Sequence, residues 1–210
     1  MSAVEGFVHR YVAGSGPATL LLLHGTGGDE HQLIDLGRQM APEAALLSPR
    51  GQVLEDGIAA RFFARRGVGD LDLDDLRRRG DDLAAWIGAA CLAYGRDPAR
   101  VIAVGYSNGA NIAVELLFRH PGVVRGAALL RAMLPYRPEA PLELTGTDVL
   151  IAAGDSDPYS PAAQVAELAE LLTAGGADVQ VARQATGHGL VQGDLDALGA
   201  WLRPRAGGAS

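Results

Sequence analysis

The chain alternates short apolar runs with longer segments of helical pattern. The apolar runs are Phe7–Val12, Ala18–Leu23, Ala44–Leu47, Val101–Tyr106, Val124–Leu130, Asp148–Ala153 and Val179–Ala182. The helical patterns are Gln32–Met40, Leu76–Tyr94, Asn108–Arg119, Pro161–Ala174 and Leu190–Leu202. Strands that alternate with helices predict an α/β fold with a mostly parallel central sheet of about seven strands and helices on both faces.

Two of the runs indicate that the sheet is covered on both sides. Leu20–Leu23 and Val101–Val104 are continuously apolar, which is typical of strands buried on both faces. Turn chemistry places one of the helices: Ser160 precedes Pro161 at a predicted helix start, and Gly175 follows the predicted helix end.

A length of 210 residues suits one compact domain, and the sequence contains no internal repeat and no clear linker. We expect a single α/β domain over residues 1–206 and a disordered tail over 207–210. The stretch Gly51–Asp75 is the least regular and is too long for a plain connection, so we expect it to shape a binding site. No segment is long enough for a large helical lid, although this stretch could form a small one.

The charge pattern excludes several function classes. The net charge of −7 argues against nucleic acid as a partner. All 18 basic residues are arginine, which excludes a Schiff-base lysine and a phosphate-loop lysine. The clusters Arg65-Arg66 and Arg77–Arg79 could form an anion site, but the carboxylates around both favour a solvated surface.

Three further features bear on the cellular compartment of the protein. No apolar run approaches the roughly 20 residues that cross a bilayer, so we expect no membrane association. Met1–Glu5 lacks the basic and apolar regions of a signal peptide. The single Cys91 cannot form an internal disulfide, which fits a reducing compartment, and we therefore expect a cytoplasmic protein.

The motif with the most specific chemistry is Gly105-Tyr106-Ser107-Asn108-Gly109, which matches G-x-S-x-G. A predicted strand precedes it and a predicted helix follows it, which is the context of a nucleophile elbow. The sharp turn strains the serine, and Gly105 and Gly109 leave room for close packing. The alternative is a tight strand-to-helix turn with an incidental serine.

A serine nucleophile needs a base, and five histidines are available. His188 lies between two glycines after the last predicted strand, where a structural role is weak, and we favour it as the base. His24 follows a strand and is expected to order the glycine-rich loop after it. His9 and His31 are expected at the surface, and His120 is expected to cap a helix end or to be solvated.

The base in turn needs a carboxylate that fixes its tautomer. Both acids of Asp155-Ser156-Asp157 follow a predicted strand. We favour Asp157, because it lies further out on the loop and the following Pro158 holds it extended. Asp155, which could instead bond to local backbone amides, stays open as the alternative. The order Ser107, Asp157, His188 is that of α/β-hydrolases.

An oxyanion intermediate requires preorganised donors. One is the backbone amide of Asn108, the residue after the serine. The second is expected from the loop His24–Gly28, with Thr26 as the favoured donor. This loop lacks the motifs of glycine-rich phosphate-binding loops, which weakens that alternative.

Several motifs together carry a resemblance to a known family. They are Leu23–Glu30, Ser48–Gly51, Arg61–Phe63, the elbow, Gly154–Pro158 and Gly187-His188, in that order. The chain resembles the phospholipase/carboxylesterase family of small α/β-hydrolases over about residues 18–203. Within that family it is similar to bacterial carboxylesterases related to the hydroquinone-resistance esterase.

The resemblance implies a serine carboxylesterase that hydrolyses small esters through a Ser107–His188–Asp157 triad and an acyl-enzyme. It implies oxyanion donors at Thr26 and Asn108, no metal and no organic cofactor, and it allows a homodimer. Acyl-protein thioesterases usually have Gln where this chain has Asn108, which disfavours long-chain acyl-protein substrates. Relatives that hydrolyse dienelactones use Cys at the elbow, so Ser107 disfavours that chemistry.

Two other function classes remain open. The same triad could serve an acyl-thioesterase or a lysophospholipase-like enzyme. The scaffold could also belong to a non-catalytic binding protein, because a fold alone does not establish an activity. A metallo-hydrolase is disfavoured, since the sequence has no H-E-x-x-H motif and no clustered Cys/His spacing.

Overall fold

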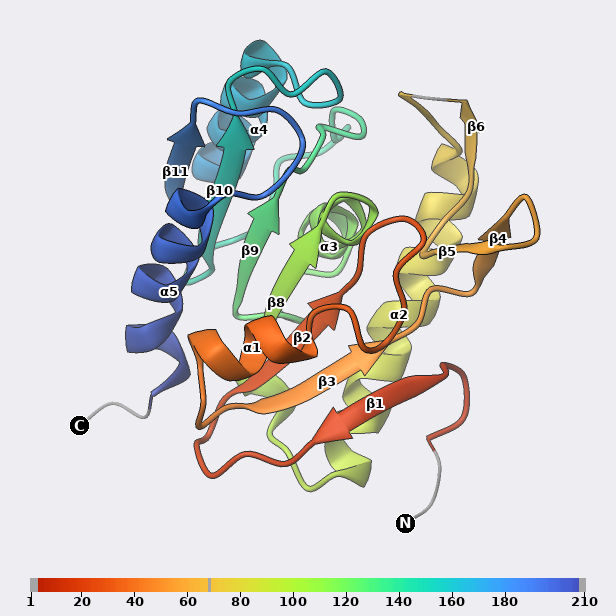
Figure 1. Cartoon of the computed structure of the whole chain (residues 1–210), viewed down its shortest axis with the longest axis vertical. Coiled ribbons are helices and arrows are strands. Elements are labelled where there is room, and N and C mark those ends of the chain that lie inside the picture. The colour runs from red at the N-terminus through yellow and green to blue at the C-terminus, as the bar shows by residue number, and fades with distance from the viewer. Residues whose placement is uncertain (1–3, 68, 208–210) are drawn as a thin grey trace.

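The computed structural model describes residues 4–67 and 69–207 and is built around a seven-stranded sheet (Figure 1). In spatial order the strands are β1 (His9–Val12), β3 (Ala45–Pro49), β2 (Thr19–Leu23), β8 (Val101–Tyr106), β9 (Gly126–Leu130), β10 (Asp148–Gly154) and β11 (Asp178–Gln184). The edge strand β1 runs antiparallel to β3, and all the other neighbours in this sheet are parallel. The predicted mostly parallel sheet of seven strands is confirmed.

Helices cover both faces of the sheet, as predicted (Figure 1). On one face lie α1 (Ile34–Met40) and α5 (Gln192–Ala206), and on the other lie α2 (Leu73–Ala93), α3 (Asn108–Arg119) and α4 (Ala162–Ala174). A short 3-10 helix, η1 (Pro98–Arg100), leads into β8. This is the arrangement of an α/β-hydrolase fold.

The central strand β2 shows why its sequence is continuously apolar. Leu21 and Leu23 pack into the cluster under α2, α3 and α4, whereas Leu20 and Leu22 pack into the cluster under α1 and α5. All four side chains have no exposed surface. Because successive residues point to opposite faces, a strand with helices on both sides must be apolar at every position.

The predicted helix limits agree with the structure to within a few residues. The largest shift at a helix start is in α2, which begins at Leu73 instead of the predicted Leu76. Asp72 caps this helix, and its side chain accepts a hydrogen bond from the Asp75 N–H. The cap satisfies one of the free amides at the helix start and so extends the helix by a turn.

Within residues 51–72, the described residues form two small hairpins at the carboxyl end of the parallel strands (Figure 1). One pairs β4 (Val53–Glu55) with β5 (Ala59–Arg61), and the other pairs β6 (Arg65–Gly67) with β7 (Asp70–Leu71). These strands have two or three residues each, too few for a hydrophobic alternation to be recognised. The sequence therefore predicted an irregular stretch where the structure has ordered hairpins.

The expected tail at 207–210 falls, from residue 208 on, outside the described residues. Gly207 follows the end of α5. In the described part of the chain, no helix has both the length and the hydropathy required to cross a membrane.

His24, at the end of β2, orders the loop that follows, as expected from the sequence. Its Nδ1–H donates to the carbonyl of Gly25 at 2.7 Å, and its Nε2 accepts from the N–H of Gly51 at 2.8 Å. The ring is 1% exposed, and burial lowers the pKa of His24. The neutral ring thereby joins the β2–α1 loop to the start of the hairpin segment.

The depressed pKa predicts that His24 weakens the fold at acid pH. Below about pH 6.5 an unfolded histidine binds a proton that the folded His24 resists, so stability is present above that pH and is lost as pH falls. We expect the free energy of unfolding to fall between pH 7 and 5.5 less steeply in His24→Gln than in wild type. The difference should be up to about 1.4 kcal/mol per pH unit, measured by urea unfolding. His31→Gln, at an exposed position, should keep the wild-type slope, and equal slopes in all three proteins would contradict the assignment.

Candidate active site

Ser107 lies at the sharp turn between β8 and α3, as predicted from its motif. Its backbone has φ 53° and ψ −112°, a strained conformation for a residue with a side chain. A Cβ at Gly105 would lie 2.4 Å from the Gly109 carbonyl oxygen, and a Cβ at Gly109 would lie 2.0 Å from the Leu23 carbonyl oxygen. Both flanking positions therefore require glycine, and the turn holds the serine at the carboxyl end of the sheet.

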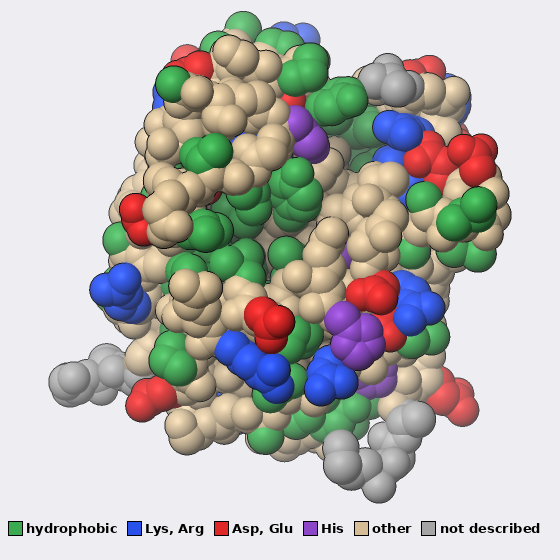
Figure 2. Space-filling view, viewed as in Figure 1, with side chains coloured by type: hydrophobic (Ala, Val, Ile, Leu, Met, Phe, Trp, Pro, Cys, Tyr) green, Lys and Arg blue, Asp and Glu red, His purple; other side chains and the backbone are tan. Residues whose placement is uncertain are grey.

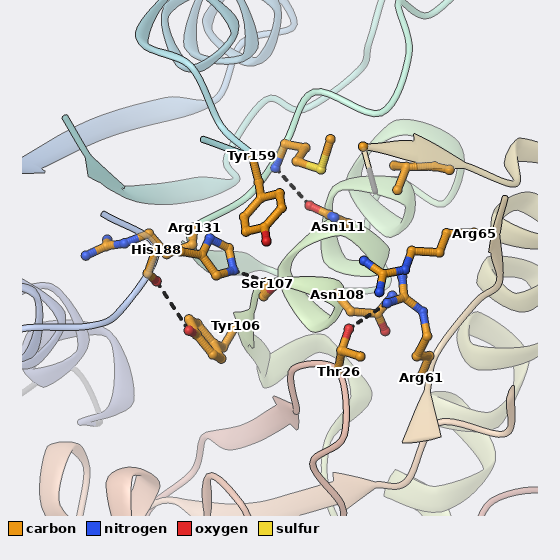
Figure 3. A pocket seen from close by; sticks show the side chains of 13 residues that line it. Thr26, Arg61, Arg65, Tyr106, Ser107, Asn108, Asn111, Arg131, Tyr159 and His188 are labelled. Atoms are coloured by element: carbon orange, nitrogen blue, oxygen red, sulfur yellow. Dashed lines mark hydrogen bonds between the residues drawn. The ribbon is translucent and has the colours of Figure 1, made fainter. Parts of the chain in front are cut away.

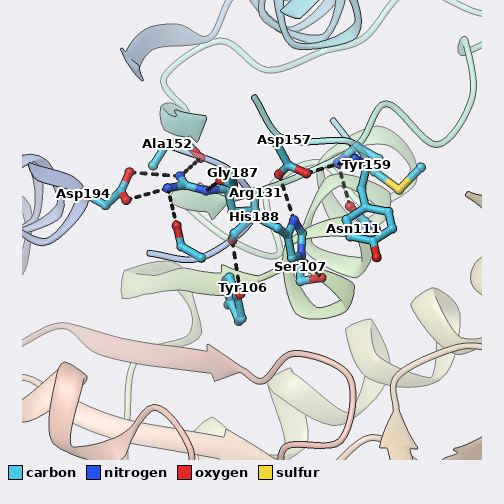
Figure 4. Close-up of polar contacts among 12 residues, drawn as sticks. Tyr106, Ser107, Asn111, Arg131, Ala152, Asp157, Tyr159, Gly187, His188 and Asp194 are labelled. Atoms are coloured by element: carbon cyan, nitrogen blue, oxygen red, sulfur yellow. Dashed lines mark hydrogen bonds and ion pairs between the residues drawn. The ribbon is translucent and has the colours of Figure 1, made fainter. Parts of the chain in front are cut away.

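The structure brings Ser107, His188 and Asp157 into one hydrogen-bonded chain (Figure 4). The Ser107 Oγ lies 2.9 Å from Nε2 of His188, and Nδ1 of the same ring lies 2.8 Å from Oδ2 of Asp157. With Nδ1 protonated toward the carboxylate, Nε2 is free to accept the serine proton. Three segments far apart in the sequence thus bring the candidate nucleophile, base and acid into contact.

Of the two candidate acids, only Asp157 contacts the histidine. Asp157 is 4% exposed, and its second oxygen accepts a hydrogen bond from the Tyr159 N–H at 2.9 Å. Asp155 points elsewhere and pairs with Arg183 at 2.8 Å on the exposed side of β11. The geometry therefore favours Asp157 over Asp155, in agreement with the sequence argument.

The loops that carry the acid and the histidine are joined by backbone hydrogen bonds beyond the end of the sheet. The Asp155 N–H donates to the Gln184 carbonyl and the Ser156 N–H to the Thr186 carbonyl, both at 2.9 Å. A Cβ at Gly154 would lie 2.2 Å from the Gly187 carbonyl oxygen, so only glycine allows this approach. The β10–β11 pairing thus extends into the site and sets the distance between the two loops.

Arg131, which the sequence analysis missed, holds the histidine loop through hydrogen bonds to its backbone (Figure 4). Its guanidinium donates to the carbonyls of Gly187 at 3.2 Å and Gly189 at 2.9 Å, on either side of His188. It also forms two hydrogen bonds, of 2.9 and 2.6 Å, with the carboxylate of Asp194. Both charged side chains are buried. The sequence feature that could have pointed to this role is the position of Arg131 directly after the apolar strand β9.

Two tyrosines flank the histidine ring. The hydroxyl of Tyr106 donates to the His188 carbonyl at 3.2 Å, and burial raises the pKa of that hydroxyl. The ring of Tyr159 meets the imidazole edge-on, with ring centroids 4.8 Å apart. These contacts restrict the imidazole to the orientation that faces Ser107.

The two expected oxyanion donors lie at the same cavity. Asn108 is the first residue of α3, where backbone amides are free and the helix dipole favours negative charge. Among the described residues, neither the Asn108 N–H nor the Thr26 N–H donates to another protein atom. The side chains have other partners: Asn108 Oδ1 accepts from the Phe62 N–H at 2.7 Å, and Thr26 Oγ1 accepts from Arg61 Nη1 at 2.6 Å.

Ser107 opens into a cavity of about 290 Å³ (Figure 3). The hairpin segment supplies one wall with Arg61, Arg65, Gly69 and Leu71, as expected if this stretch shapes a binding site. The other lining residues are Thr26, Tyr106, Ser107, Asn108, Asn111, Arg131, Met133, Tyr159 and His188. Within the described residues, no group of three or more His, Cys, Asp or Glu side chains is arranged to hold a metal ion.

Comparison with known proteins assigns the chain to a family. Residues 73–196, more than half of the chain, match the model of the dienelactone hydrolase family. The chain belongs to this family. MhqD of Bacillus subtilis (strain 168), a family relative named as a hydrolase, is 43% identical over 93% of this chain and 97% of its own length.

Solved structures extend the comparison to bacterial esterases. A Bacillus cereus carboxylesterase is 38% identical, with a TM-score of 0.92 over 96% of this chain and 95% of its own. YahD, solved with malic acid, is 30% identical, with a TM-score of 0.88 over 95% of this chain and 100% of its own. The predicted resemblance to bacterial carboxylesterases is confirmed. The protein is accordingly an ester hydrolase of the carboxylesterase type.

Proposed function

We propose that the protein is a serine carboxylesterase in which Ser107, His188 and Asp157 form the catalytic triad. The observation that carries the proposal is the unbroken chain of hydrogen bonds, 2.9 and 2.8 Å long, from the Ser107 hydroxyl through His188 to a buried carboxylate. A nucleophile within reach of a base, itself oriented by a third group, is the arrangement that activates a serine.

The reaction proceeds by two acyl transfers. His188 Nε2 takes the Ser107 proton as Oγ attacks the ester carbonyl, and the N–H groups of Thr26 and Asn108 hold the oxyanion. The imidazolium gives that proton to the leaving alcohol, and the acyl group remains on the serine. A water molecule, deprotonated by His188, then attacks the acyl-enzyme and releases the acid and the free serine.

The cavity favours small polar substrates. Its volume of about 290 Å³ lies at the lower end of the range for ligand pockets, and arginine, asparagine and threonine contribute to its walls. YahD was solved with malic acid, a small polar carboxylic acid. A ligand of this kind fits the same proposal for the present chain, in contrast to a long acyl chain.

The proposal predicts covalent labelling of Ser107 by a fluorophosphonate probe, mapped by peptide mass spectrometry. The labelled protein should lose hydrolysis of 4-nitrophenyl acetate in proportion to the label. A matched pair, ethyl butanoate and S-ethyl butanethioate, distinguishes an esterase from a thioesterase with the same triad. Absence of labelling would favour a binding protein on this scaffold, and a preference for the thioester would shift the proposal to a thioesterase.

A further inference from the structure

One wall of the cavity carries an excess of positive charge. Arginines 61, 65 and 131 line the cavity, and no Asp or Glu is among the described residues that line it. Arg131 is neutralised by the buried Asp194, which forms two hydrogen bonds to it. Arg61 and Arg65 remain, on the wall formed by the hairpin segment.

Arg61 is held rigidly in this wall. Its side chain is 4% exposed, Nε donates to the Phe63 carbonyl at 3.1 Å, and Nη1 donates to the hydroxyl of Thr26 at 2.6 Å. Its environment is unfavourable for a cation, because burial and the neighbouring Arg65 both lower the pKa of the Arg61 guanidinium. A buried cation that touches the cavity is stabilised by any anion that enters it.

Arg65 competes with Arg61 for a single carboxylate. Its Nε and Nη2 bond to Glu55 at 2.5 and 3.1 Å, and Glu55 also lies 3.6 Å from Nη1 of Arg61. Acidic and basic side chains meet over this segment in Figure 2. Two guanidinium groups thus share one carboxylate, which leaves a local charge of about +1 at the cavity wall.

Unused donors remain on both side chains. Within the described part of the chain, Nη2 of Arg61 and Nη1 of Arg65 have no hydrogen-bond partner. Figure 3 shows the two guanidinium groups close together, across Ser107 from His188. A ligand that reacts at Ser107 can therefore extend toward these donors, which match the geometry of a carboxylate.

Two other ion pairs with buried carboxylates are balanced. Arg131 pairs with Asp194, and Arg50 pairs with Glu30 through two hydrogen bonds. A purely structural role for the hairpin wall would call for one carboxylate per arginine in the same way. The unbalanced wall is found at the cavity of the candidate nucleophile, where a charged ligand can supply the missing anion.

We propose that Arg61 and Arg65 form a subsite for a carboxylate on the substrate, and that the enzyme acts on small half-esters of dicarboxylic acids. Glu55 is the counter-ion that occupies the arginines when the subsite is empty and that competes with the substrate anion. This inference rests on the proposed esterase function and adds the substrate class to it. Arg61 also contacts Thr26 and is buried, so Arg65, with a side chain that is 29% exposed, is the position to test.

The test compares monomethyl succinate, glutarate and adipate with their neutral methyl-ketone isosteres, of which methyl 5-oxohexanoate matches monomethyl glutarate. We expect the wild-type kcat/KM to be higher for at least one half-ester than for its isostere. Arg65→Gln should reduce that preference roughly ten- to a hundredfold, the usual effect of losing hydrogen bonds to a charged group. Acid release in a pH-stat measures both substrates.

Two further variants distinguish an effect of the subsite from a general effect of the protein's net charge. Arg66→Gln removes the same charge from the adjacent residue, whose side chain is 63% exposed and lies 3.8 Å from Asp72. It should leave the preference unchanged. Glu55→Gln removes the competing anion and should increase the preference several-fold. Raising the salt concentration should lower kcat/KM for the half-ester more than for the isostere.

A binding measurement keeps the subsite and the esterase proposal distinguishable. In Ser107→Ala, calorimetric titration with the preferred half-ester should give a Kd that Arg65→Gln weakens at least tenfold and Arg66→Gln leaves unchanged. Equal Kd values and equal preferences in the Arg65 and Arg66 variants would overturn the subsite, even with ester hydrolysis intact. Selective binding without any turnover would instead overturn the esterase proposal and retain the subsite.

Discussion

Replacing Ser107 by alanine is expected to lower kcat for 4-nitrophenyl acetate by a factor on the order of 10⁶, to the residual rate of the site without its nucleophile. In the proposed mechanism the Ser107 Oγ forms the acyl-enzyme, and among the described residues this is the hydroxyl that contacts the His188 ring, at 2.9 Å. The change removes one oxygen and keeps the backbone of the elbow, so substrate binding should persist while turnover is lost.

The control for this variant is Ser15→Ala, at an exposed position in the connection between β1 and β2. It should keep wild-type kcat and KM. Thermal unfolding of both variants close to wild type would show that the loss at Ser107 is chemical. A Ser107→Ala protein that retains more than about one per cent of kcat would contradict the triad, because a lost nucleophile cannot leave that much activity.

The sequence predicted the parts of the site that depend on local pattern. The elbow was recognisable because its strand, turn and helix are contiguous in the sequence. Gly105 and Gly109 also indicated it, since close backbone packing at both positions requires glycine. Asp157 and His188 were found as polar residues that follow apolar runs, at the edge where parallel strands end. The same reasoning could not exclude Asp155 as the triad acid. Its side chain turns away from His188 to pair with Arg183 on β11, a contact that the sequence does not show.

The parts that the sequence did not predict depend on contacts between distant segments. The cluster at Arg65 and Arg66 was interpreted as a solvated surface because acidic residues surround it; Arg66 is exposed as expected, whereas Arg65 is half-buried. The two neighbours diverge: Arg65 lines the cavity and pairs with Glu55, whereas Arg66 is exposed and faces Asp72. In a hairpin, adjacent side chains point to opposite faces, and strands of three residues leave no pattern that shows which face is buried.

Arg131 is the second residue that only the structure revealed, and Arg131→Met is expected to destabilise the protein by about 3–5 kcal/mol. Asp194 has no exposed surface, so the variant would leave a buried carboxylate without its cation. The carbonyls of Gly187 and Gly189 would also lose a donor. For a chain of this size the loss corresponds to a decrease in Tm of roughly 6–20 °C, measured by calorimetry.

The second variant, Arg131→Met with Asp194→Asn, separates the two consequences of that change. The neutral amide side chain removes the buried charge and can still accept the hydrogen bond that Asp194 receives from the Val191 N–H at 2.8 Å. Much of the lost stability should return, while kcat stays below wild type, because the carbonyls beside His188 still lack their donor. If Arg131→Met alone had the wild-type Tm, the ion pair would not be what holds this loop. Full recovery of both Tm and kcat in the double variant would show that Arg131 only balances the charge of Asp194.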